Sequence, residues 1–533
     1  MANIGDYETT YADFEWETPE RFNFGGDVVD GWEEDRPAMI WLGASGEERS
    51  LTFGDFSRLS SKFASAAREM GVGHGDRVMV LLDKVPEWHA VLTGLLKLGA
   101  IAIPCAPQLR SGDLKFRAEH SGSTMIVAGA EGIGEVEKMR GDAPSLRHFV
   151  SIGEENDGWS YFEELTGGAS EDFTAEDTTS DEGAFILYTS GTTKNPKGVL
   201  HTHGYTHAKR MQARYWLDLQ EGDRLWCTSG TGWAKSIWNV YLGPWSWGTE
   251  IFFHEGGFDP AERLDLIQNY GITVLCQAPT EYRLLAKTPE LEGADLSKLR
   301  HAVSAGEPLN PPVIEMWRDL HDITIYDGYG QTENTLVVGN FPGLEVRPGS
   351  MGKPSPGCDV RVIDGAGNEC PPDEPGDIAL AGRIPALFKE YWEQPDETEA
   401  VFTEDGYYVT GDRAYRDGDG YFWFVGRSDD VILSAGYRIG PFEVESVLIE
   451  HPAVVESAVV PAPDEDRGSV VKAYVVLGKD YEPSDELARE IQDFCKAETA
   501  PYKYPRKVEF VTELPKTTSG KIRRVELRQR EMA

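Results

Sequence analysis

The segment YTSGTTKNPKG, residues 188–198, directly follows the apolar run AFIL at residues 184–187. A short apolar run before a Gly-containing turn predicts a buried strand, which here leads into a loop of Ser, Thr, Gly and Lys. Hydroxyl and backbone N–H groups of such a loop can surround phosphate oxygens, while Gly191 permits close approach and Lys197 adds positive charge. The spacing differs from the GxxxxGKS/T phosphate loop, and a surface turn has the same composition. The segment therefore predicts a strand followed by a candidate phosphate site.

On the N-terminal side of this segment, helical and strand patterns alternate. The stretch 51–71 carries apolar residues at a spacing of three to four, and it ends on Gly71. It is followed by the buried-strand run DRVMVLL (76–82), another amphipathic stretch and the run AIAIP (100–104). Strands that alternate with helices predict a parallel sheet covered by helices.

The pattern changes at about residue 345, where short strands are separated by Gly, Asp and Pro turns. These strands are expected at 359–364, 376–382, 407–412 and 420–426. They predict an antiparallel sheet or a small barrel. A further mixed unit of about a hundred residues then begins, with the order helix, strand, strand, helix, strand.

We therefore expect an α/β protein with two domains. The large N-terminal domain, 1–428, combines helix-covered sheets with a small β-barrel-like subdomain at about 345–428. A hinge is expected at Asp429, followed by a small mobile α+β C-terminal domain at 430–533.

Composition excludes several classes of partner. The chain has 533 residues with 90 acidic against 51 basic side chains, a formal charge of −39. Such a surface repels nucleic acid and anionic membranes. It also favours a salt-rich cytoplasm over simple solubility as the origin of the charge. The longest apolar stretch, 90–104, contains Lys97 and is too short to cross a membrane. We expect neither a nucleic-acid partner nor a membrane span.

The termini and cysteines indicate where the protein works. The acidic, polar N-terminus has none of the features of a targeting peptide. The six cysteines are far apart and form no CxxC pair, so neither a disulfide framework nor a zinc site is indicated. A cytoplasmic location is expected.

The segment TSGTT-x-x-PKG resembles the phosphate loop of the adenylate-forming superfamily, which includes acyl-CoA synthetases, adenylation domains and luciferases. Five further motifs typical of that superfamily follow in order over nearly the whole chain: SAGEPLN (304–310), DGYGQTE (327–333), YVTGD (408–412), GRSDDVILSAGYRIGPFEVE (426–445) and PKTTSGKIRR (515–524). The one departure is Lys194, where that superfamily usually has a small residue. Six ordered motifs are far more specific than any one of them.

This resemblance implies an ATP site with a defined set of residues. The phosphates would be held by the loop and Lys197, the adenine by the segments at 306–308 and 327–329, and the ribose by Asp412 and Arg427. The implied ATP-binding residues are Thr189, Ser190, Gly191, Thr192, Thr193, Lys197, Gly306, Glu307, Pro308, Asp327, Gly328, Tyr329, Gly330, Gln331, Thr332, Asp412, Arg427, Arg438 and Lys521.

The same resemblance implies the catalytic groups. Thr332 would meet the α-phosphate, and Glu333 would bind Mg²⁺, because a carboxylate is the hard oxygen ligand that this ion prefers. Lys521 would neutralise the charge that develops on phosphorus in the first step. Rotation about Asp429 would then exchange Lys521 for the segment SAGY (434–437), so that a thiol can reach the same carbon.

Within the superfamily, the C-terminal segments most resemble the medium-chain acyl-CoA synthetases. This implies a set of coenzyme A contacts: Gln108, Ala435, Gly436, Tyr437, Arg467, Lys496 and Tyr504. The segment TGWAKSIWNVYLGPWSWG (231–248) resembles the acyl pocket, with Trp233, Lys235 and Trp238 as its residues. Trp238 would shorten the pocket and favour small or branched acids. At least two of the four indoles in this segment are expected to be core.

These expectations combine into one function. An AMP-forming acid–CoA ligase would convert a short- or medium-chain carboxylic acid, with ATP, Mg²⁺ and coenzyme A, into an acyl-CoA. Three alternatives stay open: a benzoate-type ligase for aromatic acids, a free-standing adenylation enzyme that loads a carrier protein, and a luciferase-like oxidoreductase or non-catalytic nucleotide binder. The sequence fixes neither the acid nor the oligomeric state.

Overall fold

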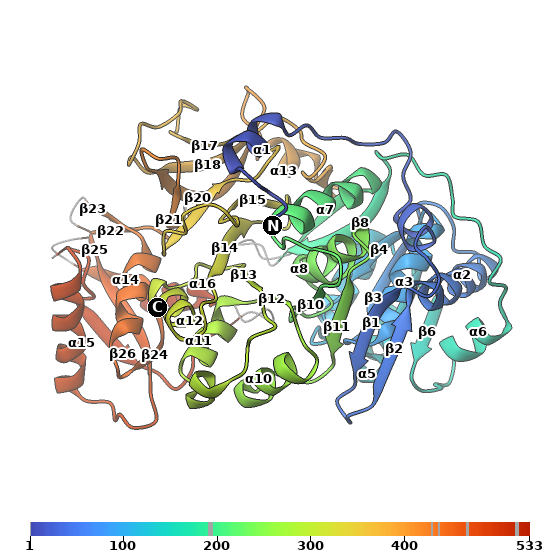
Figure 1. Cartoon of the computed structure of the whole chain (residues 1–533), viewed down its shortest axis with the longest axis horizontal. Helices are drawn as coiled ribbons and strands as arrows, with labels where there is room; N and C mark the ends of the chain where they lie inside the picture. Colours follow the sequence, from blue (N-terminus) through green and yellow to red (C-terminus); the bar gives the residue numbers. More distant parts are fainter. Residues whose placement is uncertain are drawn as a thin grey trace.

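The computed structural model describes residues 2–189, 196–427, 430–434, 437–464, 468–500, 502–516 and 522–532. Residues 53–168 lie at one end of the long axis and the C-terminal elements at the other, while the N-terminus lies between them (Figure 1). The described residues form two large sheets and two small ones.

The first large sheet has eight strands in the order β19-β9-β8-β4-β3-β5-β6-β7. Its bounds are β3 (Arg77–Leu81), β4 (Ile101–Pro104), β5 (Met125–Gly129), β6 (His148–Ile152), β7 (Ser160–Tyr161), β8 (Gly183–Thr189), β9 (Lys197–Thr202) and β19 (Glu390–Tyr391). The strands from β4 to β6 are parallel, as expected. The associated helices are α2 (Phe53–Glu69), α3 (Pro86–Lys97), α4 (Ser111–Ser121), α5 (Ala130–Met139) and α6 (Phe162–Gly168).

Helix α2 shows why the local sequence folds as predicted. Its N-cap Thr52 accepts a hydrogen bond from the backbone of Asp55, whose side chain accepts from the backbone N–H of Thr52 in return. This capping box satisfies two N–H groups that would otherwise lack partners. Its buried face includes Phe53, Phe56 and Phe63.

The second large sheet has thirteen strands in the order β17-β18-β20-β21-β16-β15-β14-β13-β12-β10-β11-β1-β2. Its first part comprises β1 (Pro37–Leu42), β2 (Glu48–Thr52), β10 (Arg224–Cys227), β11 (Glu250–His254), β12 (Val274–Gln277), β13 (His301–Ala305) and β14 (Ile325–Gly330). The strands from β1 to β14 in this row are parallel, and β15 (Leu336–Gly339) is antiparallel to β14. Parallel strands place their carboxyl ends at one edge, where ligands usually bind.

The β-rich part predicted from residue 345 is antiparallel, as expected. It contains β16 (Ser350–Pro354), β17 (Val360–Ile363), β18 (Gly376–Ala381), β20 (Tyr407–Arg416) and β21 (Phe422–Arg427). Its strands continue through β16 and β15 into the large sheet. The β-rich part is therefore coupled directly to the strands whose ends carry the DGYGQTE motif.

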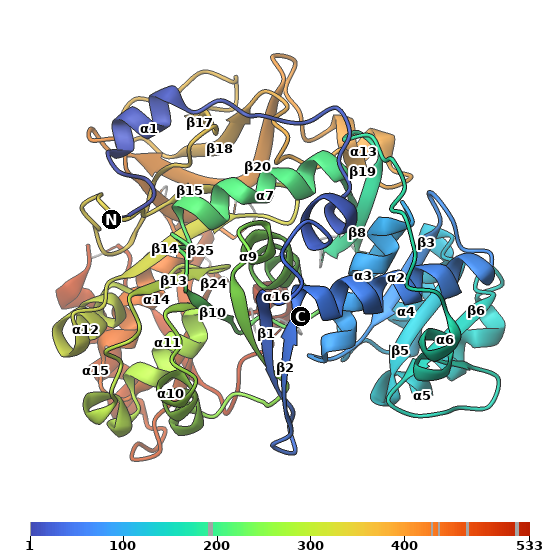
Figure 2. The same ribbon diagram turned by 45° about the vertical axis from the view of Figure 1, so that its right-hand side comes forward.

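The remaining N-terminal elements cover the sheets or connect their strands. They are α1 (Tyr7–Asp13), η1 (Phe24–Val29), η2 (Arg140–Asp142), α7 (His203–Tyr215), α8 (Ala234–Ser236), η3 (Ile237–Leu242), α9 (Gly243–Ser246), α10 (Pro260–Asn269), α11 (Pro279–Ala286), η4 (Pro289–Gly293), α12 (Pro311–His321) and α13 (Pro395–Glu399). Figure 2 shows α7 crossing the middle of the molecule, below the β-rich part.

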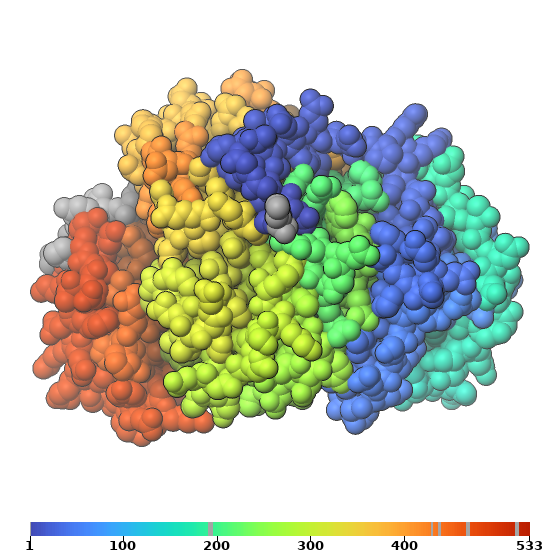
Figure 3. Space-filling model, in the orientation of Figure 1, coloured from blue at the N-terminus to red at the C-terminus, as the bar shows by residue number. Residues whose placement is uncertain are grey.

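The N-terminal segment is bound along the outside of this assembly, where it is dark blue in Figure 3. The Tyr7 hydroxyl donates to the Pro354 carbonyl at 2.7 Å, and the Trp16 indole donates to the Gly357 carbonyl at 2.7 Å. Asn3 donates to the Leu219 carbonyl at 2.9 Å. The segment thus ties the β-rich part to the chain that follows α7.

The C-terminal unit has its own core, and it contains the predicted order of helix, strand, strand, helix and strand, preceded by two short strands and followed by a further helix. Its elements are β22 (Ile432–Ser434), β23 (Tyr437–Ile439), α14 (Pro441–Glu450), β24 (Val454–Asp464), β25 (Gly468–Leu477), α15 (Asp485–Glu498), β26 (Lys507–Phe510) and α16 (Arg524–Met532). The strands β24, β25 and β26 form one sheet. Throughout the described part of the chain, no helix has the length and apolar character needed to cross a membrane.

Candidate active site

The carboxyl ends of β12, β13 and β14 meet at one edge of the large sheet. In register, Ser304 lies between Gln277 and Asp327 on the neighbouring strands. The Lys235 ammonium bridges this edge, because its Nζ donates to the Gln277 carbonyl at 3.0 Å and to the Ala305 carbonyl at 3.1 Å. The edge therefore brings the predicted acyl residue Lys235 next to the segment predicted to hold adenine.

Asp327 is buried at this edge and has an oxygen without a partner. Its Oδ2 accepts from the Leu309 backbone N–H at 3.3 Å, while Oδ1 has no hydrogen-bond partner among the described residues. Burial raises the pKa of this carboxyl to about 7. A buried acceptor without a donor is rare in folded proteins, and the amino group of adenine is a donor of the right kind.

Gly306 and Glu307, on the other side of the predicted adenine site, are fixed by local geometry. Gly306 has a φ of 114°, a backbone region that favours glycine. The Glu307 carboxylate accepts from Arg283 at 2.6 Å and from the Thr280 hydroxyl at 2.6 Å. Both donors lie on α11, so this helix holds the segment in place.

Asp412 is the centre of a hydrogen-bond network on β20. Its Oδ2 accepts from the Tyr329 hydroxyl at 2.7 Å and from the Gln331 amide at 2.6 Å. The Tyr408 hydroxyl donates to the side-chain amide oxygen of Gln331 at 2.9 Å. Arg427 is the register partner of Asp412 on β21. The structure thus joins four predicted ATP residues, Tyr329, Gln331, Asp412 and Arg427, in one place.

Glu333 lies a short distance along the same motif. Its Oε1 accepts from the Tyr391 hydroxyl at 2.9 Å, and its backbone carbonyl accepts from the Phe388 N–H at 2.6 Å. Burial raises the pKa of this carboxyl. The described residues contain no group of three or more acidic, His or Cys side chains that would hold a metal by themselves. A single carboxylate fits Mg²⁺ that is held mainly by phosphate oxygens and water.

The segment 188–198 begins on β8 and ends on β9, and these two strands are paired. Thr189 at the end of β8 is opposite Lys197 at the start of β9. The Lys197 ammonium forms an ion pair with Glu397 at 2.5 Å and lies 4.6 Å from the centre of the Tyr391 ring. Because Tyr391 also binds Glu333, Lys197 and the predicted magnesium residue share a neighbour. The predicted residues Ser190, Gly191, Thr192 and Thr193, and the exceptional Lys194, lie outside the described residues.

The four tryptophans of the predicted acyl segment have different environments. Trp245 is fully buried in the core and packs on Phe53 and Phe56, as expected for a core indole. Trp238 is also buried, and the Lys209 ammonium lies 4.4 Å from the centre of its ring. Trp233 is partly buried against the core of the first sheet.

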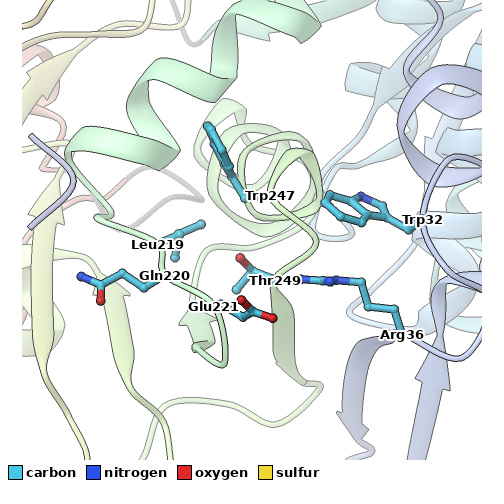
Figure 4. A pocket seen from close by; sticks show the side chains of 7 residues that line it. All are labelled: Trp32, Arg36, Leu219, Gln220, Glu221, Trp247 and Thr249. Atoms are coloured by element: carbon cyan, nitrogen blue, oxygen red, sulfur yellow. The ribbon is translucent and has the colours of Figure 1, made fainter. Parts of the chain in front are cut away.

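Trp247 instead lines a hollow that is open to the surface, shown in Figure 4. The hollow has a volume of about 290 Å³ and is lined by Trp32, Arg36, Leu219, Gln220, Glu221, Trp247 and Thr249. None of these is a predicted site residue. Arg36 lies 4.5 Å from the Trp32 ring centre and donates to the Gly248 carbonyl at 2.8 Å, so its charge is already engaged.

Two predicted coenzyme A residues come together in the C-terminal unit. The Lys496 ammonium lies 5.6 Å from the centre of the Tyr504 ring. The guanidinium of Arg506, the residue directly before β26, lies 4.9 Å from the centre of the same ring. Gln108 is exposed in the turn after β4. Tyr437 and Arg438 belong to β23, and only their backbone is described. The predicted residues Ala435, Gly436, Arg467, Lys521 and the hinge residue Asp429 lie outside the described residues.

The C-terminal unit contacts the adenine side of the N-terminal part. Lys287 donates to the Val454 carbonyl at 2.8 Å, and the Asn310 amide donates to the Ser446 hydroxyl at 3.2 Å. Arg524, three positions after Lys521, is bound to Glu445 at 2.5 Å. Burial acts to lower the pKa of Arg524, but Glu445, with Glu307 from the N-terminal part, raises it overall.

Three residues of this site were not predicted from the sequence. Tyr391 holds Glu333, Tyr408 holds Gln331, and Lys209 lies against Trp238. Tyr408 is the first residue of the motif YVTGD, which was its signal, whereas Tyr391 belongs to a segment without a distinctive pattern. Lys209 lies on the buried face of α7, where a lysine is unusual.

Comparison with known proteins gives two family matches. Residues 28–392 match the family described as AMP-binding enzyme, and residues 443–521 match the AMP-binding enzyme C-terminal domain. The mitochondrial acyl-coenzyme A synthetase ACSM3 of Mus musculus is 44% identical over 546 residues, covering 99% of this chain and 94% of the relative. The uncharacterized acyl–CoA ligase YtcI of Bacillus subtilis (strain 168) is 46% identical and covers 93% of each chain.

A solved structure extends the comparison to three dimensions. The anthranilate CoA ligase AuaEII, in complex with anthranoyl-AMP, superposes with a TM-score of 0.90. It is 31% identical to this chain, and the match covers 96% of this chain and 98% of that one.

Proposed function

The chain belongs to the family of AMP-binding enzymes, and we propose that it is an AMP-forming acid–CoA ligase. It joins a carboxylic acid to the AMP part of ATP and then passes the acyl group to coenzyme A. The observation that carries this proposal is that Asp327, Glu333 and Asp412 lie around the carboxyl end of one strand, β14. Two relatives that are acyl-CoA synthetases or ligases by name, both over more than nine-tenths of the chain, support it.

ATP is held by three carboxylates with different tasks. Asp327 accepts from the adenine amino group through its unpartnered Oδ1. Asp412, oriented by Tyr329 and Gln331, accepts from the ribose hydroxyls. Glu333, oriented by Tyr391, binds the Mg²⁺ that accompanies the phosphates. Lys197 exchanges Glu397 for phosphate when the nucleotide enters.

In the first step, a carboxylate oxygen of the acid bonds to the α-phosphorus while the bond to pyrophosphate breaks. Thr332 and Lys521 contact the phosphate oxygens, where charge accumulates. In the second step, the thiol sulfur of coenzyme A bonds to the acyl carbon, the bond to AMP breaks, and the thiol proton leaves to solvent. No nucleophile of the protein is required.

The domain arrangement belongs to the proposal. Residues 1–428 bind ATP and the acid, Asp429 is the hinge, and residues 430–533 move as one unit. The AMP-binding family match ends at 392 and the C-terminal match begins at 443, and the proposed hinge at Asp429 lies in the interval between these two matches. Lys496, Tyr504 and Arg467 hold coenzyme A, with Gln108 and the segment 435–437 completing the set.

The acid is short or medium in chain length, with Trp238 as the floor of the pocket. An aromatic acid is the second candidate, because the anthranilate ligase has nearly the same fold and indole walls suit a flat ring. Replacing Trp238 by glycine is expected to shift the preference toward acids longer by two or more carbons, measured as kcat/KM over a chain-length series. An unchanged profile in a folded variant contradicts the assignment.

The function is tested by pyrophosphate and AMP release over linear C2–C12, branched and aromatic acids, each with and without coenzyme A. We expect release that requires an acid, with thioester formed only when coenzyme A is present. Thioester formed only on a carrier protein favours the adenylation alternative. Repeating the series from low to molar KCl tests the salt-rich, cytoplasmic setting, for which the expected result is activity that rises with salt.

A further inference from the structure

Helix α7 has a polar buried face. Tyr205, Lys209 and Gln212 follow the spacing that places side chains on one side of a helix, and all three are buried. A helix face that points into a core normally carries apolar residues. The polar groups therefore need partners, and their partners identify what the face does.

The first partner is the chain directly after Glu333. The Asn334 carbonyl accepts from the Tyr205 hydroxyl at 2.8 Å and from the Lys209 ammonium at 3.2 Å. The Gln212 amide oxygen accepts from the Thr335 hydroxyl at 2.9 Å and from the Leu336 N–H at 3.3 Å. The α7 face thus holds the turn that carries the proposed magnesium residue.

The second partner is η3, the π-helical segment that carries Trp238. The Lys209 ammonium lies 4.4 Å from the Trp238 ring centre, and the Gln212 amide donates to the Asn239 side chain at 2.5 Å. Short π-helical segments are common at functional sites. The Lys209 ammonium therefore contacts both the Asn334 carbonyl and the Trp238 ring.

Lys209 has no ordinary structural explanation. It is 1% exposed, burial holds the pKa of its ammonium well below the usual value, and no carboxylate among the described residues lies within ion-pair distance of it. Lys97 on α3 shows the ordinary case: it is equally buried, but it binds Asp30 at 2.6 Å. Buried lysines without a charged partner are costly to keep.

We propose that Lys209 is a positioning residue that sets acid selectivity by fixing the Trp238 indole while anchoring the Glu333 turn. This inference rests on the proposed function, because it concerns the acid pocket and magnesium residue of that same site. Lys209 touches neither the acid nor ATP in this account. It acts through Trp238 and through the Asn334 carbonyl.

The test compares Lys209→Met with Lys97→Met. Methionine has a similar length and fills the space without an amine. In Lys209→Met, the ratio of kcat/KM between the preferred acid and one two carbons longer is expected to change about tenfold or more. The KM for MgATP is expected to rise about two- to tenfold, because the Asn334 carbonyl loses one donor. Lys97→Met is expected to lower the melting temperature and leave both quantities as in the wild type.

A double variant isolates the route through the indole. In a Trp238→Gly background, Lys209→Met is expected to leave the chain-length ratio unchanged, because the side chain it positions is gone. A ratio that shifts equally in both backgrounds overturns the proposal. So does an unchanged ratio in folded Lys209→Met, or an equal shift in Lys97→Met. Lys209→Gln, which also lacks the ammonium over the indole, carries the same selectivity prediction if Lys209→Met does not fold.

A measurement without turnover separates this inference from the proposed function. Amide hydrogen exchange at 237–242 and 334–336 is expected to accelerate in Lys209→Met and not in Lys97→Met. Unchanged exchange in both segments contradicts the positioning role even in an active enzyme. A wild-type protein that releases no AMP with any acid contradicts the proposed function, whatever the exchange shows.

Discussion

The nucleotide edge, formed by Asp327, Glu333 and Asp412, and the C-terminal unit present opposite kinds of side chain. At the edge, Asp327 and Asp412 are buried and Glu333 is partly buried. Tyr329, Gln331 and Tyr391 hold two of these carboxylates in fixed orientations. In the C-terminal unit, the predicted ligand-binding cation whose side chain the structure describes, Lys496, is exposed and lies beside Tyr504. A fixed set of acceptors suits orientation of a nucleotide, whereas cations on a separate unit suit charge delivered at a particular step.

The largest effect is expected from removing Lys521, the cation of the C-terminal unit that is proposed to act in the first step. Lys521→Ala is expected to slow adenylate formation about 10²- to 10³-fold, because one donor to a developing charge contributes on that scale. Thioester formation from supplied acyl-adenylate is expected to stay near the wild-type rate. Single-turnover measurement of each half-reaction gives both rates.

Lys516 is the matched control for Lys521. It lies on the same segment and forms an ion pair with Glu456 at 2.8 Å. Lys516→Ala is expected to leave both half-reactions within about threefold of the wild type, since exposed ion pairs contribute little. The assignment of Lys521 to the first step is contradicted if Lys521→Ala slows both half-reactions equally. It is also contradicted if Lys516→Ala causes a comparable loss.

A smaller effect is expected from the protonation of Asp327. The pKa of this carboxyl is raised from 3.8 to about 7, with burial as the main cause. An ionised carboxylate accepts from adenine better than a protonated one, so ATP affinity is expected to rise about tenfold as the pH goes from 6 to 8. The ratio of wild-type to Asp327→Asn affinity isolates this carboxyl from titration of the phosphates. A ratio independent of pH contradicts the assignment.

The raised pKa of Asp327 also predicts how the stability of the folded protein changes with pH. Between pH 4 and pH 7 the unfolded chain loses the Asp327 proton while the folded chain keeps it, so this group lowers the free energy of unfolding as the pH rises through that window. Urea unfolding of the wild type and Asp327→Asn at pH 5 and pH 7 measures the contribution. A difference between the two proteins that does not change with pH argues against a raised pKa.

The smallest effect is expected at the coenzyme A side. Lys496→Ala is expected to raise the KM for coenzyme A about two- to fivefold, because an exposed charge pair contributes little free energy. The rate of adenylate formation is expected to be unchanged, as measured by acid-dependent exchange of pyrophosphate into ATP. If that exchange falls as much as thioester formation, Lys496 does not act only in coenzyme A binding, and the assignment is contradicted.

The sequence predicted most of the fold because its signals are local. The helix expected at 51–71 is α2, and the strands expected at 76–82 and 407–412 are β3 and part of β20. Continuity of the β-rich part with the large sheet was not predictable, because β16 also pairs with β21, where Ser350 lies opposite Trp423, 73 positions further along the chain. Local patterns specify elements better than they specify which strands become neighbours.

The site was predicted through its motifs, and the residues that hold the motifs were not. Asp327, Glu333 and Asp412 stand in recognisable segments. Tyr391 and Lys209 act across 58 positions from Glu333 and 125 positions from Asn334, respectively. Such contacts exist only after the chain has folded, so no spacing in the sequence marks them.

The central claim is that the acid becomes reactive by bonding one of its own oxygens to the α-phosphorus of ATP. The direct measurement uses an acid labelled with ¹⁸O in both carboxylate oxygens, with ATP, Mg²⁺ and coenzyme A, followed by mass spectrometry of the products. The account predicts one ¹⁸O atom in each AMP and none in pyrophosphate. AMP without label, or ADP with ¹⁸O in inorganic phosphate, contradicts it.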